Sequence, residues 1–203
     1  EVKMFRMLLA AALIGICLVF AGAPHAQNLL SAPEGIVFDY EHNRYLVSNW
    51  NSGAVVAIDS NGTQSYLRGG LGNCSGMLIL DGILYVSCTN TNLIGLDLET
   101  GATVFDMALS PSGLHGITVD AAGILYVADW STNNIYKVDP VAQTSQTLAH
   151  QGLSRPLGIE YDAANHRLMV VSFGSNNWIQ SVDCLDGTVE YVLNTGFPNL
   201  DDI

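Results

Sequence analysis

Four segments of the chain repeat one pattern of apolar and polar positions. Each contains a glycine followed by alternating or continuous apolar residues, as in a β-strand, and they read PEGIVFD, CSGMLIL, LHGITVD and PLGIEYD. Their glycines, Gly35, Gly76, Gly116 and Gly158, lie about 40 residues apart. A period of this length predicts a repeat architecture in which each unit buries its faces against the next.

Three further runs follow each glycine segment, with turn residues between them. The second runs are RYLVSN, ILYVSC, LYVAD and RLMVVS; the third are AVVAID, NLIGLDL, NIYKVD and WIQSVD; the fourth, more polar, are TQSYL, ATVFDMA, SQTLA and TVEYVL. Four short strands per repeat, without helical periodicity, predict an all-β chain built from β-propeller blades, each a four-stranded antiparallel sheet. The glycine fits this fold because inner strands crowd near the propeller axis, where a side chain would clash.

The predicted blades begin near residues 33, 74, 114, 156 and 199. The final residues, GFPNLDDI, read as the opening of a fifth blade, with Asp202-Ile203 in the place of Gly158-Ile159. Four blades and one strand do not close a six-bladed ring, so we expect the chain to be part of a longer propeller. A closed four-bladed ring and oligomerisation through open blade faces are the alternatives.

The third repeat carries a resemblance to a known family. Its sequence HGITVDAAGILYVADWSTNNIYKVD resembles an NHL repeat, and the likeness extends over residues 33–203. The same layout is similar to the gluconolactonase (senescence-marker-protein) superfamily and, more distantly, to the YWTD propellers. These families are mostly six-bladed, and their shared fold hosts many chemistries, so the resemblance implies a fold more strongly than a function.

Residues 1–26 predict a secretory signal peptide. Lys3 and Arg6 precede the apolar run MLLAAALIGICLVFAGA, and small residues lead to a cleavage site after Ala26. A membrane anchor is the alternative, because the run approaches the length of a span. We therefore expect residues 27–203 to be an exported propeller, periplasmic or extracellular, without a stable membrane span after cleavage.

The net charge of the chain narrows the classes of partner that it could bind. The formal net charge of −12 disfavours nucleic acid as a partner, because an acidic surface repels phosphate backbones.

Three cysteines, Cys74, Cys88 and Cys184, remain after signal removal, and the first two flank a hairpin centred on Asp81-Gly82. In a regular two-residue hairpin Cys74 would lie opposite Thr89, so a Cys74–Cys88 disulfide requires an irregular strand end.

No catalytic or phosphate-binding motif stands out in the chain, and His42 and His166 fall in turns predicted to lie at the surface. Trp50, Trp130 and Phe173 occupy one equivalent place after the second strands. Aromatic side chains there can pack between blades, or they can form a platform on which a flat ligand stacks.

The residue before each glycine starts an inner strand, where a side chain can face the central channel; these residues are Glu34, Ser75, His115, Leu157 and Asp201. Carboxylates and an imidazole at one channel mouth can hold a divalent cation, but they are also ordinary polar channel linings. The gluconolactonase resemblance implies calcium or zinc here, with Glu34, His115 and Asp201 as the candidate ligands. His115 stands where that family has asparagine, and Leu157 cannot ligate a metal, which weakens the expectation of lactonase activity.

Two functions are the main hypotheses, and other roles, including a segment of a receptor-like ectodomain, are further alternatives. The first is an exported NHL-type propeller that binds a small molecule or a protein at its channel mouth. The second is a metal-dependent lactonase-like hydrolase.

Overall fold

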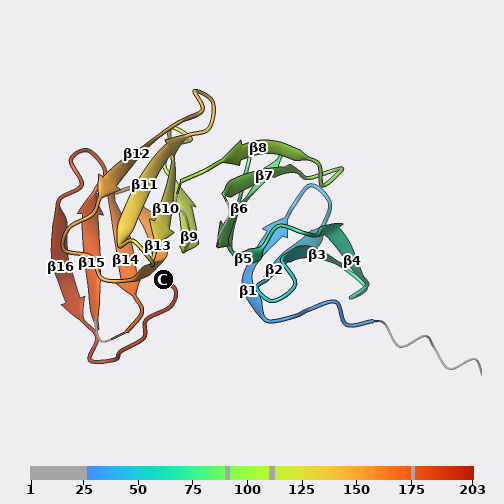
Figure 1. The fold of residues 1–203 in the computed structure, drawn as a ribbon, viewed down its shortest axis with the longest axis horizontal. Helices are drawn as coiled ribbons and strands as arrows, with labels where there is room; N and C mark the ends of the chain where they lie inside the picture. The colour runs from blue at the N-terminus through green and yellow to red at the C-terminus, as the bar shows by residue number, and fades with distance from the viewer. Residues whose placement is uncertain (1–26, 90–91, 110–112, 175–176) are drawn as a thin grey trace, which may run out of the picture.

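A computed structural model describes residues 27–89, 92–109, 113–174 and 177–203 of the chain. The described residues form sixteen strands in four antiparallel sheets, each made of four strands consecutive in sequence (Figure 1). The predicted signal peptide lies outside these residues. Among the residues described, no helix has the length and apolar character needed to cross a membrane.

The first sheet contains β1 (Pro33–Asp39), β2 (Arg44–Asn49), β3 (Ala54–Asp59) and β4 (Gln64–Arg68). The second contains β5 (Asn73–Leu80), β6 (Ile83–Thr89), β7 (Leu93–Asp97) and β8 (Thr103–Met107). The third contains β9 (Leu114–Val119), β10 (Leu125–Asp129), β11 (Asn134–Asp139) and β12 (Thr144–Ala149). The fourth contains β13 (Pro156–Asp162), β14 (Arg167–Ser172), β15 (Trp178–Asp183) and β16 (Val189–Asn194).

The four sheets are propeller blades that follow one another around an axis, which confirms the predicted fold class. Their first strands, β1, β5, β9 and β13, are the innermost and contact each other in this order. The C-terminal segment lies close to the end of this series, beside β13 (Figure 1).

Apolar side chains fill the spaces between consecutive blades, in three separate cores. One core joins the first and second blades through Leu46 and Leu84, among others, and the next joins the second and third through Tyr85 and Leu125. The last, around Tyr126, joins the third and fourth blades. The second and third blades therefore bury both faces against their neighbours, and the first and fourth blades each bury the face that meets the next blade in the series.

The repeated glycine sits where neighbouring inner strands come closest. An added Cβ on Gly76 or Gly116 would lie less than 3.0 Å from the carbonyl oxygen of His115 or Leu157, respectively, on the next inner strand. Gly35 and Gly158 meet the carbonyl groups of Ser75 and Asp201 in the same way. The glycine thus lets the strands approach, and each one packs on the residue that precedes the next glycine position.

At the opposite end of the inner strands, a polar network joins the first two blades. The Arg44 guanidinium donates from Nε to Asp39 Oδ2 at 2.9 Å, and Asp39 is buried. His42 bridges the same carboxylate, at 2.8 Å from Nδ1, and Glu99 of the second blade, at 2.9 Å from Nε2. His42 is therefore a half-buried contact between blades and not the simple surface residue expected from its turn.

We expect substitution of Gly76 by alanine to destabilise the fold by about 1–3 kcal/mol, the usual cost of inserting a methyl group into a closed space. Gly69 provides the matched control, because its Cβ would meet no heavy atom within 4 Å and its φ is not positive. Gly69→Ala should change stability by less than about 0.5 kcal/mol. Urea denaturation of both variants checks this, and equal effects would contradict the close packing of the inner strands.

The His42 bridge predicts a pH-dependent contribution to stability. Hydrogen bonds to Glu99 and then Asp39 raise the pKa of His42 above its usual 6.5. The stability that the His42 bridge contributes is therefore complete below about pH 6.5. It is lost as the pH rises through the raised pKa that His42 has in the folded protein. Wild type should exceed His42→Gln in thermal midpoint more at about pH 6 than at about pH 9. A midpoint difference that is the same at both pH values would contradict this bridge.

Candidate functional site

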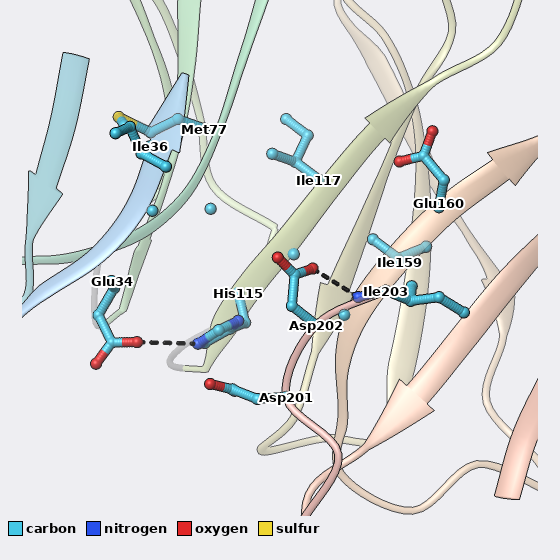
Figure 2. Close-up of a pocket in the computed structure, with 14 residues that line it drawn as sticks. Glu34, Ile36, Met77, His115, Ile117, Ile159, Glu160, Asp201, Asp202 and Ile203 are labelled. Carbon is cyan, nitrogen blue, oxygen red and sulfur yellow. Dashed lines mark hydrogen bonds and ion pairs between the residues drawn. The ribbon is translucent and has the colours of Figure 1, made fainter. Parts of the chain in front are cut away.

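A cavity of about 220 Å³ lies where the inner strands of the blades converge. Backbone atoms of the repeated glycines form part of its wall. We call this cavity the channel mouth, and Figure 2 shows the side chains that line it. Among them are the three predicted site residues, Glu34 at the start of β1, His115 in β9 and Asp201 in the C-terminal segment.

These three residues come together because of the glycine packing. Glu34 and His115 each precede one of the repeated glycines. Asp201 precedes Asp202, which holds the equivalent position and whose Cα lies against Gly158. Two other residues at the same repeat position do not line the cavity: Ser75 and Leu157 are buried. The Ser75 hydroxyl instead donates to the carbonyl oxygen of Leu114 at 3.1 Å. The shared repeat position therefore predicts the backbone site but not the direction of every side chain.

Sequence reasoning missed the apolar part of the lining. The residue after each glycine position lines the cavity in every repeat, and the middle three of these residues also belong to the cores between blades; the residues are Ile36, Met77, Ile117, Ile159 and Ile203. The signal was present in the chain, because this position is Ile or Met each time. Figure 2 shows Ile36, Met77 and Ile117 on one side of the cavity and the charged group of Glu34, His115 and Asp201 on another.

Glu160 and Asp202 add two further carboxylates to the lining. Glu160 stands two residues after Gly158, where the other blades carry Val37, Leu78 and Thr118. The channel mouth is thus amphipathic, with an acidic rim next to an apolar wall.

The imidazole Nε2 of His115 lies 4.0 Å from Glu34 Oε2, a contact between the first and third blades. Burial lowers the pKa of His115, while the charges of Asp201 and Asp202 oppose this shift. Burial also raises the pKa of Glu34, and the Asp201 charge adds to that effect. Because His115 is mainly neutral at pH 7, the contact is a weak polar interaction and not a strong ion pair.

The three predicted metal ligands line one cavity without forming a close group. Among the described residues, no three His, Cys, Asp or Glu side chains are close enough to hold a metal ion. Calcium or zinc binding by Glu34, His115 and Asp201 stays a prediction, and it requires these groups to close in on one another.

The aromatic residues predicted as a ligand platform lie on the loops after β2, β10 and β14. Arg155 links Trp130 and Phe173. Its guanidinium lies 5.2 Å from the ring centroid of Trp130 and 5.0 Å from that of Phe173. Cation–π contacts of this length are favourable, so Arg155 ties the third blade to the fourth. Trp50 lies apart, on the first blade.

Arg155 therefore occupies one face of the Trp130 ring and one face of the Phe173 ring. The sequence pattern did not identify this contact. Stacking of a ligand on Trp50, Trp130 or Phe173 stays a prediction, and at Trp130 and Phe173 it needs a free opposite face or movement of Arg155.

The charges at the channel mouth make a prediction that does not require a ligand. Substituting Asp201 by Asn removes a negative charge that raises the pKa of both Glu34 and His115. The pKa of His115 should therefore fall further below 6.5. An NMR titration of the His115 imidazole in wild type and Asp201→Asn checks this. Asp81→Asn, in the β5–β6 turn, is the control and should leave the titration unchanged; equal curves for all three proteins would show that Asp201 is not at the mouth.

Comparison with known proteins supports the fold. A scan against protein-family models and a search of curated proteins found no match. Among solved structures, a chain of the nidogen/laminin complex is 19% identical with a TM-score of 0.72, covering 86% of this chain and 68% of that one. A streptogramin B lyase is 16% identical with a TM-score of 0.65, covering 79% of this chain and 54% of the lyase.

A catalytically inactive virginiamycin B lyase from Staphylococcus aureus, determined with quinupristin, is 14% identical with a TM-score of 0.70. That alignment covers 86% of this chain and 60% of the lyase, so this chain spans little more than half the length of either lyase. At these identities the likeness shows the fold. The chain has the blade architecture of a β-propeller.

Proposed function

We propose that this chain is the ligand-binding part of an exported NHL-type β-propeller, and that it binds without catalysing a reaction. The observation that carries the proposal is the channel mouth, where an acidic rim meets an apolar wall inside a cavity of about 220 Å³. Its volume is below the roughly 300–1,000 Å³ of pockets for drug-sized ligands, so the part of a ligand that these residues hold is small.

Charge favours a cationic group in this cavity. Glu34, Glu160, Asp201 and Asp202 line it, and the His115 imidazole, whose pKa is lowered by burial, offers little positive charge at pH 7. The apolar wall suits a short hydrocarbon segment next to that cation. A small organic ammonium ion has this chemistry, and so does the end of a lysine side chain on a protein partner.

Two of the similar structures support binding as a use of this fold. One is a complex of nidogen with laminin, and the other was determined with quinupristin, so related propellers are found with protein and with small-molecule partners. Export rests on the predicted signal peptide at residues 1–26. A metal-dependent lactonase is less well supported, because the three candidate ligands do not form a metal-binding group in this structure.

The proposal predicts that butylammonium binds at the channel mouth more tightly than butyrate, an anion of similar size. In NMR titrations of the full-length protein, butylammonium should shift the His115 imidazole resonances, and Asp201→Asn should weaken its binding several-fold. Asp81→Asn should bind as wild type does. Equal binding of the cation and the anion, or shifts confined to residues outside the cavity, would contradict a cation-selective mouth.

The non-catalytic part of the proposal has its own test. Lactone hydrolysis is measured with calcium, zinc and manganese, in wild type and Glu34→Ala. We expect no metal-dependent turnover. Turnover that requires metal and is abolished by Glu34→Ala would establish the hydrolase instead, whatever the result with butylammonium.

A further inference from the structure

Two of the cysteines face each other on adjacent strands. Cys74 of β5 lies directly opposite Cys88 of β6, and their sulfur atoms are 3.7 Å apart. An irregularity in the register between Cys74 and Met77 produces this alignment. Counting back from the turn in a regular hairpin would instead place Cys74 opposite Thr89.

The backbone at this position already has the separation that a disulfide requires. Residues directly opposite in an antiparallel pair have Cα atoms about 4.5–5.5 Å apart, and disulfides span Cα distances of roughly 4.4–6.8 Å. The two sulfurs point toward each other, since they are within the range of a weak S–H contact. Rotation of the side chains is therefore enough to bring them to bonding distance.

Other blades carry different residues at the positions of Cys74 and Cys88. In the first blade it is Pro33 and Asn49, and the Asn49 side chain accepts from Ser31 N at 3.1 Å and donates to Leu29 O at 2.9 Å. These bonds secure the segment that leads into the blade. In the third blade the pair is Leu114 and Asp129.

Asp129 accepts four hydrogen bonds from the backbone and hydroxyl groups of Ser131 and Thr132. The loop after the second strand of the third blade is thereby secured as well. In the second blade the polar residue is replaced by Cys88, whose thiol is a weaker hydrogen-bonding group. A covalent bond to Cys74 would instead tie β6 to β5 at this position.

We propose that Cys74 and Cys88 form a disulfide that links β5 to β6 within the core between the first two blades. A thiolate of one cysteine attacks an external disulfide, such as oxidised glutathione or a disulfide oxidoreductase, and releases one thiol. The second cysteine then displaces the other thiol from the mixed disulfide. Both cysteine protons are lost, and the two electrons reduce the external disulfide.

The bond forms while the hairpin assembles. Cys74 and Cys88 have no exposed surface and lie in the core between the first two blades. Their mutual contact and burial raise the pKa of Cys74, which disfavours the reactive thiolate once the core has closed. The proposal is independent of what the channel mouth binds.

Peptide mapping tests the bond. The full-length protein is refolded from denaturant in a glutathione redox buffer, unfolded again, alkylated and digested with trypsin. Residues 69–137 form one peptide with both cysteines, whereas Cys184 lies in a separate peptide that begins at residue 168. We expect the first peptide to be unalkylated and about 2 Da lighter than its dithiol form, with Cys184 alkylated. Alkylation of both Cys74 and Cys88, or a link from either one to Cys184, would overturn the proposal.

Thermal melting provides a second readout. The oxidised protein should melt at a higher temperature than the reduced protein, because a cross-link restricts the unfolded chain. This difference should vanish in Cys74→Ala and in Cys88→Ala but persist in Cys184→Ala. A difference that survives in the first two variants would assign the effect to another site and contradict the proposal.

Discussion

The close approach of neighbouring inner strands is the constraint on which the rest of this structure depends. Gly76 and Gly116 each pack, without a side chain, against a carbonyl group of the next inner strand. This contact brings the blades near enough for their apolar faces to form the three cores between them. It also fixes the residue before each glycine position at one end of the channel, which is where Glu34, His115 and Asp201 meet.

The blades themselves could be predicted from sequence because their signals are local and repeated. Apolar alternation identifies strands, Asp81-Gly82 identifies a hairpin turn, and the recurrent glycine marks the inner strand of every unit. Position in the repeat also placed Glu34 and His115 on different blades of one channel. The strands, the turn and the blade on which each residue lies depend on backbone position alone, so they can be predicted without knowing where side chains point.

The remaining features depend on details that a repeat does not encode. A register irregularity brings Cys74 opposite Cys88, and strict counting along the hairpin places it opposite Thr89. Ser75 and Leu157 share the repeat position of His115 but are buried. Arg155 stacks between aromatic residues of two different blades, and only their three-dimensional arrangement reveals this contact.

The packing of the inner strands can be measured directly by NMR. The account predicts strong nuclear Overhauser effects between Hα protons of Gly76 and Gly116, which belong to different blades, and between those of Gly158 and Asp202. The second contact reports whether the C-terminal segment reaches the channel mouth. Absence of both effects, in spectra that show the expected contacts between strands of the same blade, would contradict the account.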